Sequence, residues 1–307
     1  MIDQSGQANF FALVKSGTPA EIQAEIDRGA DVHDVDETDY DATSLYLAAA
    51  YNKNAEVISV LVRAGADIEA RNHLTETPLF GAVGNNPNPD MITALLAADA
   101  DVHARNGDGS TALAWAAAFT SNPAVITRLL EAGADIKVRD DSGRTPFMDA
   151  AGFNTNPEVF EALLNAGAEV NARDNEGVTP LMWAAATNEN PEVPNILLRA
   201  GAEVSAADSA GKTPLMWAAE ANRMQQVIGV LVQAGAEVSA RDNSGMTALM
   251  YAAKNTRNPS NIVCALLEAG ADAMAKDNKG KTAIEYAQNN ERLRGTDAYR
   301  KLQEAST

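Results

Sequence analysis

Seven threonines lie 34 residues apart, each from the next, and an eighth follows after 35 residues: Thr43, Thr77, Thr111, Thr145, Thr179, Thr213, Thr247 and Thr282. A fixed period of this size predicts one supersecondary unit that is stacked on copies of itself. Each unit of such a chain buries its apolar face only against its neighbours, so we expect a repeat array in place of one compact core. The class of function that this architecture favours is binding.

Residues 172–206 carry the local signals of one unit. Gly177 supplies the positive φ that a turn needs, and Asp174 can accept a hydrogen bond from the backbone two residues further on. The hydroxyl of Thr179 can cap a short helix, and Pro180 suits the first helical position because its missing N–H would have no partner there. The unit therefore begins with a turn and a short helix.

A second helix is predicted between Asn190–Pro191, which repeats the start signal, and Gly201, which ends the helix in the left-handed region. The helix-ending glycine recurs in most units: Gly29, Gly65, Gly133, Gly167, Gly201, Gly235 and Gly270. The Asn-Pro start recurs as well: Asn88–Pro89, Asn122–Pro123, Asn156–Pro157, Asn190–Pro191 and Asn258–Pro259. Counting the atypical ends, we expect nine units of turn, helix, turn, helix and loop.

The chain is strongly acidic, with 307 residues and a formal net charge of -18. A surface of this charge repels nucleic acid and anionic lipid, so neither is expected as a partner. It favours a basic protein partner, although acidic residues also serve simply to keep a surface solvated.

Targeting and redox signals are sparse. The N-terminus lacks the basic and apolar regions of a signal peptide, and no apolar stretch approaches the roughly 20 residues of a membrane span, so we expect a cytoplasmic protein. We also expect a monomer. The single cysteine, Cys264, falls in the apolar run 262–267 and is predicted to be a buried small hydrophobic residue.

No constellation for catalysis is present, so no enzyme, catalytic residue, cofactor or metal ligand is predicted. His33 and His103 occupy equivalent sites two repeats apart, about 16–20 Å from each other, which is too far for a shared metal ion. The acidic segment 31–41 is two residues longer than the other hairpins. Its oxygen-rich side chains leave two interpretations open, a calcium site and an acidic hairpin tip.

The residues of the repeat resemble the ankyrin repeat family. The resemblance rests on Gly177–Leu181 and Gly211–Leu215, which read Gly-x-Thr-Pro-Leu, and on Gly167–Ala172, which reads Gly-Ala-Glu-Val-Asn-Ala. It covers essentially the whole chain. It implies an all-α solenoid of about nine helix-turn-helix units with projecting hairpin loops, and protein recognition through the hairpin tips and the concave helix face.

On this basis residues 1–307 are expected to form a single ankyrin-repeat domain, with residues 1–35 as the N-terminal capping repeat, residues 36–275 as seven internal repeats and residues 276–307 as the C-terminal capping repeat. Two departures from the family are systematic. The usual repeat has about 33 residues, whereas the repeat of this chain has 34. The histidine that follows Thr-Pro-Leu in the family is replaced throughout, by Tyr46, Phe80, Ala114, Met148, Met182, Met216 and Met250. That histidine makes a hydrogen bond within the fold, and its absence puts this local bond in doubt.

Within the family's geometry, the residues four, seven and eight after each threonine face the concave side or pack beneath the hairpins. All three tryptophans of the chain fall at the first of these positions. The candidate binding residues of the helices are Tyr51, Trp115, Phe119, Asp149, Phe153, Trp183, Trp217 and Tyr251. Those of the hairpin tips are His73, Asp108, Arg144, Glu176, Lys212 and Met246. The alternative is that the tryptophans fill space between helix and hairpin, whereas exposure is favoured for Phe119 and Phe153.

One unit departs from the rules. Thr75 replaces its turn glycine and Asp99 its helix-ending glycine, while Gly81, Gly84 and Pro87 weaken its first helix. Such departures mark either a functional or strained site or ordinary drift in a tolerant array.

The expected function is a non-enzymatic scaffold that binds a protein or peptide. Two alternatives stay open, a regulatory or inhibitory subunit of an enzyme and a secreted effector that acts in a host cell.

Overall fold

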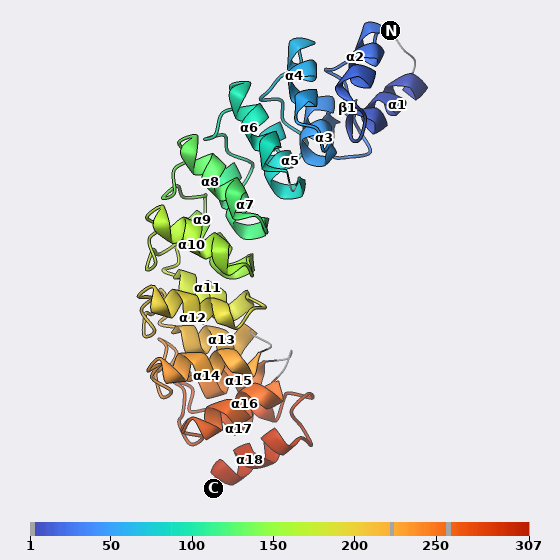
Figure 1. The fold of residues 1–307 in the computed structure, drawn as a ribbon. Coiled ribbons are helices and arrows are strands. Elements are labelled where there is room, and N and C mark those ends of the chain that lie inside the picture. The colour runs from blue at the N-terminus through green and yellow to red at the C-terminus, as the bar shows by residue number, and fades with distance from the viewer. Residues whose placement is uncertain (1–3, 87, 222–223, 256–258, 307) are drawn as a thin grey trace. The chain divides into compact units, whose positions relative to one another are not determined.

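The computed structural model describes residues 4–86, 88–221, 224–255 and 259–306. In these residues the chain forms eighteen helices and one two-stranded sheet (Figure 1). The helices follow one another in antiparallel pairs, which confirms the expected all-α array of nine helix pairs. The chain divides into two compact units, Met1–Pro146 with Glu161–Ala168 and Phe147–Phe160 with Glu169–Thr307.

The first unit holds two layers of helices. The first helices of its pairs are α1 (Gln4–Val14), α3 (Ser44–Tyr51), α5 (Pro78–Asn85) and α7 (Ala112–Phe119). The second helices are α2 (Pro19–Asp27), α4 (Glu56–Arg63), α6 (Pro89–Ala97) and α8 (Pro123–Glu131). Up to α7 and α8, each helix packs on the corresponding helix of the next pair within the unit, α3 on α5 and α4 on α6 for example, so the core runs between the two layers.

The second unit repeats this arrangement. The first helices of its pairs are α9 (Pro146–Phe153), α11 (Pro180–Thr187), α13 (Pro214–Ala221), α15 (Ala248–Lys254) and α17 (Ala283–Ala287). The second helices are α12 (Glu192–Arg199), α14 (Gln225–Gln233), α16 (Pro259–Glu268) and α18 (Asp297–Ala305). Helix α10 (Pro157–Asn165) crosses the boundary between the two units.

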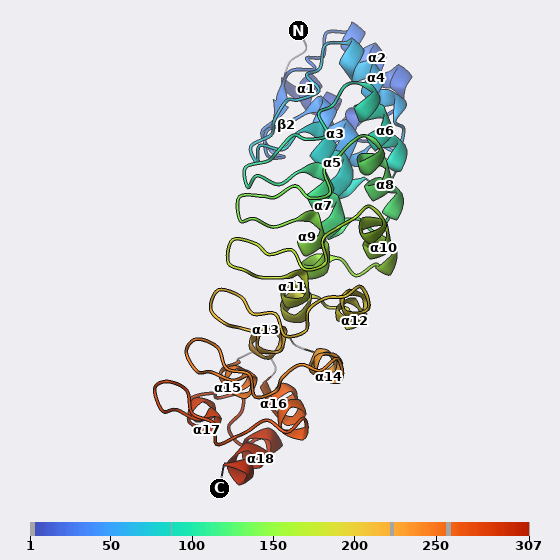
Figure 2. The same cartoon turned by 90° about the vertical axis from the view of Figure 1, so that its left-hand side faces the viewer.

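A hairpin loop precedes the first helix of each pair after α2, and within each unit these loops project to the same side of the helices (Figure 2). The hairpin aspartate holds the turn as predicted, since Asp174 Oδ1 accepts a hydrogen bond from the backbone N–H of Glu176 at 2.9 Å. Arginines link neighbouring hairpins. Arg71 donates to the carbonyl of Arg105 at 2.6 Å, and Arg105 donates to that of Arg139 at 2.7 Å. The loops therefore form a bonded series within the unit.

Helix ends follow the local signals of the sequence. Thr179 accepts a hydrogen bond from the N–H of Met182, and Thr18 forms a capping box with Glu21. All seven glycines predicted to end a helix have φ between 85° and 104°. Four other repeat threonines have a buried hydroxyl that finds no hydrogen-bond partner in the part of the chain that the structure describes, and no histidine stands three residues after them: Thr77, Thr111, Thr213 and Thr247.

A series of buried asparagines joins consecutive repeats, and sequence analysis did not identify it. Asn188 Nδ2 donates to the carbonyls of Ala151 at 2.9 Å and Asn154 at 2.8 Å, in the preceding repeat. Asn86 does the same towards Ala49 and Asn52. These residues lie in the loop after the first helix, where each amide supplies partners for carbonyls that would otherwise be buried without one.

The first hairpin differs from the others in structure as well as in length. It contains β1 (Val35–Asp36) and β2 (Ala42–Thr43), which pair antiparallel. Tyr40 and Asp41 between them have φ of 55°.

One expectation is corrected: Cys264 is half-buried and not fully buried, because α16 turns it away from the core residues Ile262, Val263 and Leu266.

Candidate functional site: an aromatic pocket in the first unit

The candidate binding residues fall into exposed, half-buried and buried groups. Tyr51, Phe119 and Phe153 expose 44%, 53% and 47% of their surface, so the exposure expected for the two phenylalanines is confirmed. The half-buried residues are Trp115, Trp183, Trp217, Arg144 and Lys212. Asp149, Met246 and Tyr251 are buried and cannot present a surface to a partner. At the hairpin tips, His73, Asp108 and Glu176 are exposed.

Tryptophans of the second unit have a structural role. Trp217 Nε1 donates to Asp208 Oδ2 of its own hairpin at 3.0 Å, and the rings of Trp183 and Trp217 lie 6.4 Å apart. Both rings pack on a small core of Val178, Met182 and Ala206. Space-filling between helix and hairpin therefore accounts for much of the tryptophan pattern in this unit.

Tyrosines at the same repeat position make the same link to the hairpin. The hydroxyl of Tyr251 donates to Asp242 at 2.6 Å, and that of Tyr286 donates to Asp277. Hydrogen bonding to Asp277, with some burial, raises the pKa of Tyr286 to about 12, and the same bond lowers the pKa of Asp277. Burial and Asp242 raise the pKa of Tyr251 above its ordinary value.

Lys212 lies between two of these rings. Its Nζ is 4.6 Å from the ring centroid of Tyr251 and 5.3 Å from that of Trp217, and it pairs with Glu220 at 2.7 Å. An ammonium over aromatic faces beside a carboxylate is a favourable cation–π arrangement. We call this group, formed by Lys212, Trp217, Glu220 and Tyr251, the lysine stack.

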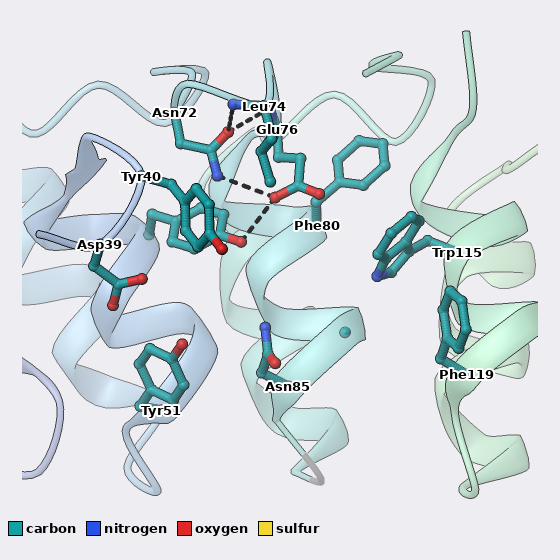
Figure 3. Close-up of a pocket in the computed structure, with 12 residues that line it drawn as sticks. Asp39, Tyr40, Tyr51, Asn72, Leu74, Glu76, Phe80, Asn85, Trp115 and Phe119 are labelled. Carbon is teal, nitrogen blue, oxygen red and sulfur yellow. Dashed lines mark hydrogen bonds between the residues drawn. The ribbon is translucent and has the colours of Figure 1, made fainter. Parts of the chain in front are cut away.

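In the first unit the aromatic side chains surround a pocket of about 410 Å³. Trp115 and Phe119 of α7 face it from one side, and Tyr40 and Tyr51 face it from the other (Figure 3). The rings of Trp115 and Phe119 meet edge to face with centroids 5.0 Å apart, as their spacing of four residues on one helix requires. The remaining lining residues are Asp39, Tyr46, Asn72, Leu74, Glu76, Phe80, Gly84 and Asn85. We call this site the aromatic pocket.

Glu76 is the buried acid of the aromatic pocket, with 6% of its surface exposed. Its Oε2 accepts hydrogen bonds from the hydroxyl of Tyr46 at 2.9 Å and from Asn72 Nδ2 at 3.0 Å (Figure 3). Burial and the neighbouring Glu76 raise the pKa of Tyr46 far above its ordinary value, so the hydroxyl keeps its proton and donates the hydrogen bond to Glu76. No cation of the described residues pairs with Glu76.

The irregular unit forms one wall of the aromatic pocket. A Cβ at Gly81 would lie 3.1 Å from Cε2 of Tyr46, so the glycine leaves room for an aromatic ring of the neighbouring helix. Thr75 and Asp99 have φ of 62° and 65°, in the left-handed region that glycine takes at the equivalent positions. Pro87 lies outside the described residues.

Sequence analysis missed Tyr40, Tyr46 and Glu76 as pocket residues. The signal for Glu76 was present, because the residue directly before the repeat threonine is otherwise alanine, serine, arginine, valine, lysine or methionine: Ala42, Ser110, Arg144, Val178, Lys212, Met246 and Lys281. Glu76 is the single acid among these aligned positions.

The acidic first hairpin directs its carboxylates mainly to its own backbone and to one lysine. Asp36 Oδ1 accepts from the N–H of Thr38 at 3.0 Å, and Lys15 Nζ lies 3.0 Å from Asp39 and 3.8 Å from Asp36. In the described parts of the chain, no three histidine, cysteine, aspartate or glutamate side chains are grouped so that they could hold a metal ion. None of the helices described is long and apolar enough to cross a membrane.

The sequence profile of ankyrin repeats in three copies matches the chain in six overlapping stretches: residues 45–140, 79–174, 113–208, 147–242, 181–277 and 231–296. The first five begin 34 residues apart, the period of the threonines. The chain belongs to the ankyrin repeat family. Members of this family are in general protein–protein interaction modules and are typically non-enzymatic. No curated protein matches the chain.

Proposed function

We propose that this protein is a non-enzymatic scaffold that binds a protein partner through the helix face carrying its exposed aromatic side chains. The observation that supports this most strongly is the position of the exposed large hydrophobic residues. Of the six found in the described residues, Tyr40, Tyr51, Leu74 and Phe119 line the aromatic pocket, and the other two are Phe153 and Met274. An exposed apolar cluster with polar surroundings is typical of an interaction site.

The net charge of -18 favours a basic partner, since complementary charge speeds association and suppresses unsuitable partners. An exposed tip of the same unit, Asp108, would add rim contacts to this surface. Residues that are buried, Asp149, Met246 and Tyr251, have no part in the proposal.

The test is affinity purification from the native cell with the wild-type chain, the double variant Tyr51→Ala/Phe119→Ala and the control Met274→Ala. Met274 has the same 53% exposure as Phe119 but lies outside the pocket. We expect a protein that the wild type and Met274→Ala retain and the double variant loses. Retention by all three folded chains would contradict the proposed binding face.

A further inference from the structure

We infer that the aromatic pocket receives the positively charged side chain of a lysine or arginine from the protein partner. This inference rests on the proposed function and adds the chemical group that the site recognises. Three observations carry it: several aromatic side chains line the pocket, the buried acid Glu76 has no cationic partner among the described residues, and the same chain forms the lysine stack elsewhere.

The aromatic lining is suited to a cation. Five aromatic side chains of the helices line the pocket: Tyr46, Tyr51, Phe80, Trp115 and Phe119. The face of an aromatic ring attracts a cation through its quadrupole, and this attraction is stronger where water is excluded. A basic side chain also has an aliphatic stem, which would cover the exposed surfaces of Phe119 and Leu74.

Glu76 supplies the counter-charge. Both hydrogen bonds that it accepts through its side chain end on Oε2, from Tyr46 and Asn72, and its Oε1 receives none from the described residues. The carboxylate lies at the wall of the pocket (Figure 3). A buried charge is costly unless it is paired, so a cation that enters the pocket gains a partner already held in place by Tyr46 and Asn72.

The lysine stack shows how this chain satisfies such a site internally. Lys212 directly precedes its repeat threonine, as Glu76 does, and it lies over Trp217 and Tyr251 beside Glu220. Lys281 occupies the same repeat position and lies 5.6 Å from the ring centroid of Tyr286. Where Lys212 and Lys281 place a cation against the rings at this repeat position, the aromatic pocket has the acid Glu76. We therefore expect the cation that pairs with Glu76 to come from outside the chain.

Lys15 contacts two residues of the pocket, Asp39 and Tyr51, and does not fill this role. Its Nζ pairs with Asp39 and Asp36 and lies 5.4 Å from the ring centroid of Tyr51. It therefore pairs with two acids of the first hairpin, while Glu76 has no cationic partner among the described residues.

The test titrates the full chain with blocked tripeptides of the form Gly-X-Gly, in which X is arginine, lysine, or one of their neutral isosteres, citrulline and Nε-acetyl-lysine. Binding is followed by the indole N–H signal of Trp115 in ¹H–¹⁵N spectra, assigned through its loss in Trp115→Phe. We expect a saturable shift with a charged peptide and affinity about tenfold lower for its neutral isostere, a difference of about 1.4 kcal/mol. Equal affinity for charged and neutral peptides, or no shift with peptide at about 10 mM, overturns the inference.

Two variants examine the role of Glu76. Glu76→Gln keeps an oxygen that can accept from Tyr46 and Asn72 but removes the charge, and it should weaken the charged peptides about tenfold. Glu237→Gln makes the same charge change on an exposed loop of the second unit and should leave the affinity unchanged. Equal loss in both variants would show that the net charge, and not the pocket, attracts the peptide. If Glu76→Gln does not fold, the charged and neutral peptides on the wild type still decide.

The outcome for the pocket is separable from the outcome for the proposed function. If the chain captures a partner through Tyr51 and Phe119 but does not distinguish charged from neutral peptides, the pocket assignment alone is overturned. If it binds the charged peptides and no partner depends on Tyr51 and Phe119, the binding face proposed above is overturned and the cation site stands.

Discussion

Gly84 of α5 and Trp115 of α7 lie so close that a Cβ at residue 84 would stand 2.8 Å from Nε1 of Trp115. Glycine inside a helix costs roughly 0.5–1 kcal/mol relative to alanine. At residue 84 the glycine leaves room for the indole ring of Trp115, which approaches the backbone of α5 and forms a wall of the aromatic pocket. The weak helix of the irregular unit is thus connected to the geometry of the candidate site.

Gly84→Ala should displace the Trp115 ring, and Gly229→Ala provides a matched control. Gly229 lies inside α14, and a Cβ there would meet nothing within 4 Å. Gly229→Ala should therefore stabilise the chain by about 0.5–1 kcal/mol, whereas Gly84→Ala should lose this gain to the displaced ring. Urea unfolding measures the difference, and the indole signal of Trp115 reports the displacement. An equal gain in both variants with an unmoved signal would show that the close contact imposes no constraint.

The second prediction concerns Asp99, which ends α6 with φ of 65° where most second helices end in glycine. A side chain in the left-handed region costs roughly 1 kcal/mol, so Asp99→Gly should stabilise the chain by about that amount. Gly133 follows α8 with φ of 94°, and Gly133→Asp is the reverse change, expected to destabilise by a similar amount. Shifts of the urea midpoint in the same direction for both variants would contradict this account.

Features that depend on a few neighbouring residues were predictable from the sequence. The capping box of Thr18 and Glu21, the turn at Asp174 and the helix end at Gly201 all follow from local backbone chemistry, and the structure has each of them. The period then repeats these local signals along the chain, so the fold class followed without any knowledge of long-range contacts.

The candidate site was only partly predictable, because its chemistry depends on contacts between repeats. The spacing of Trp115 and Phe119 placed both rings on one helix face, and their rings do meet. The bond between Tyr46 and Glu76 joins residues 30 positions apart, and its existence depends on how closely two repeats approach. Tyr251 is buried and bonded to Asp242 of its own hairpin, which a count from the threonine does not reveal.

Loss of the family's histidine leads to a prediction about the threonines. Thr247 Oγ1 is buried without a hydrogen-bond partner in the described residues, whereas Thr43 Oγ1 accepts from the N–H of Tyr46 at 3.2 Å. Valine has the shape of threonine without the hydroxyl, so Thr247→Val should be neutral or stabilise by up to about 1 kcal/mol. Thr43→Val removes a helix cap and should cost about 1 kcal/mol. Chemical unfolding of both variants checks the contrast, which equal losses would contradict.

The buried asparagines lead to a prediction about coupling between repeats. Asn188→Ala removes three hydrogen bonds, two donated to the carbonyls of Ala151 and Asn154 and one accepted from the N–H of Asn190, so it should destabilise the chain by at least about 2 kcal/mol. Asn289 is exposed and donates one long hydrogen bond of 3.5 Å to Glu285, so Asn289→Ala should change stability by less than about 0.5 kcal/mol. Urea unfolding compares them, and a small effect of Asn188→Ala would show that water replaces the amide.

Tyr286 gives a prediction about pH. Its pKa is raised from 10.0 to about 12 in the folded chain, chiefly by the hydrogen bond to Asp277. A raised pKa contributes stability that is fully present below the unfolded value and is lost as pH rises through the folded value, here between about 10 and about 12. The urea midpoint should therefore fall across this interval, and less steeply in Tyr286→Phe.

Tyr299→Phe is the control, because the Tyr299 hydroxyl has no hydrogen-bond partner among the described residues, and it should keep the wild-type slope. Identical slopes in all three chains would mean that the bond to Asp277 does not hold the proton of Tyr286 in solution.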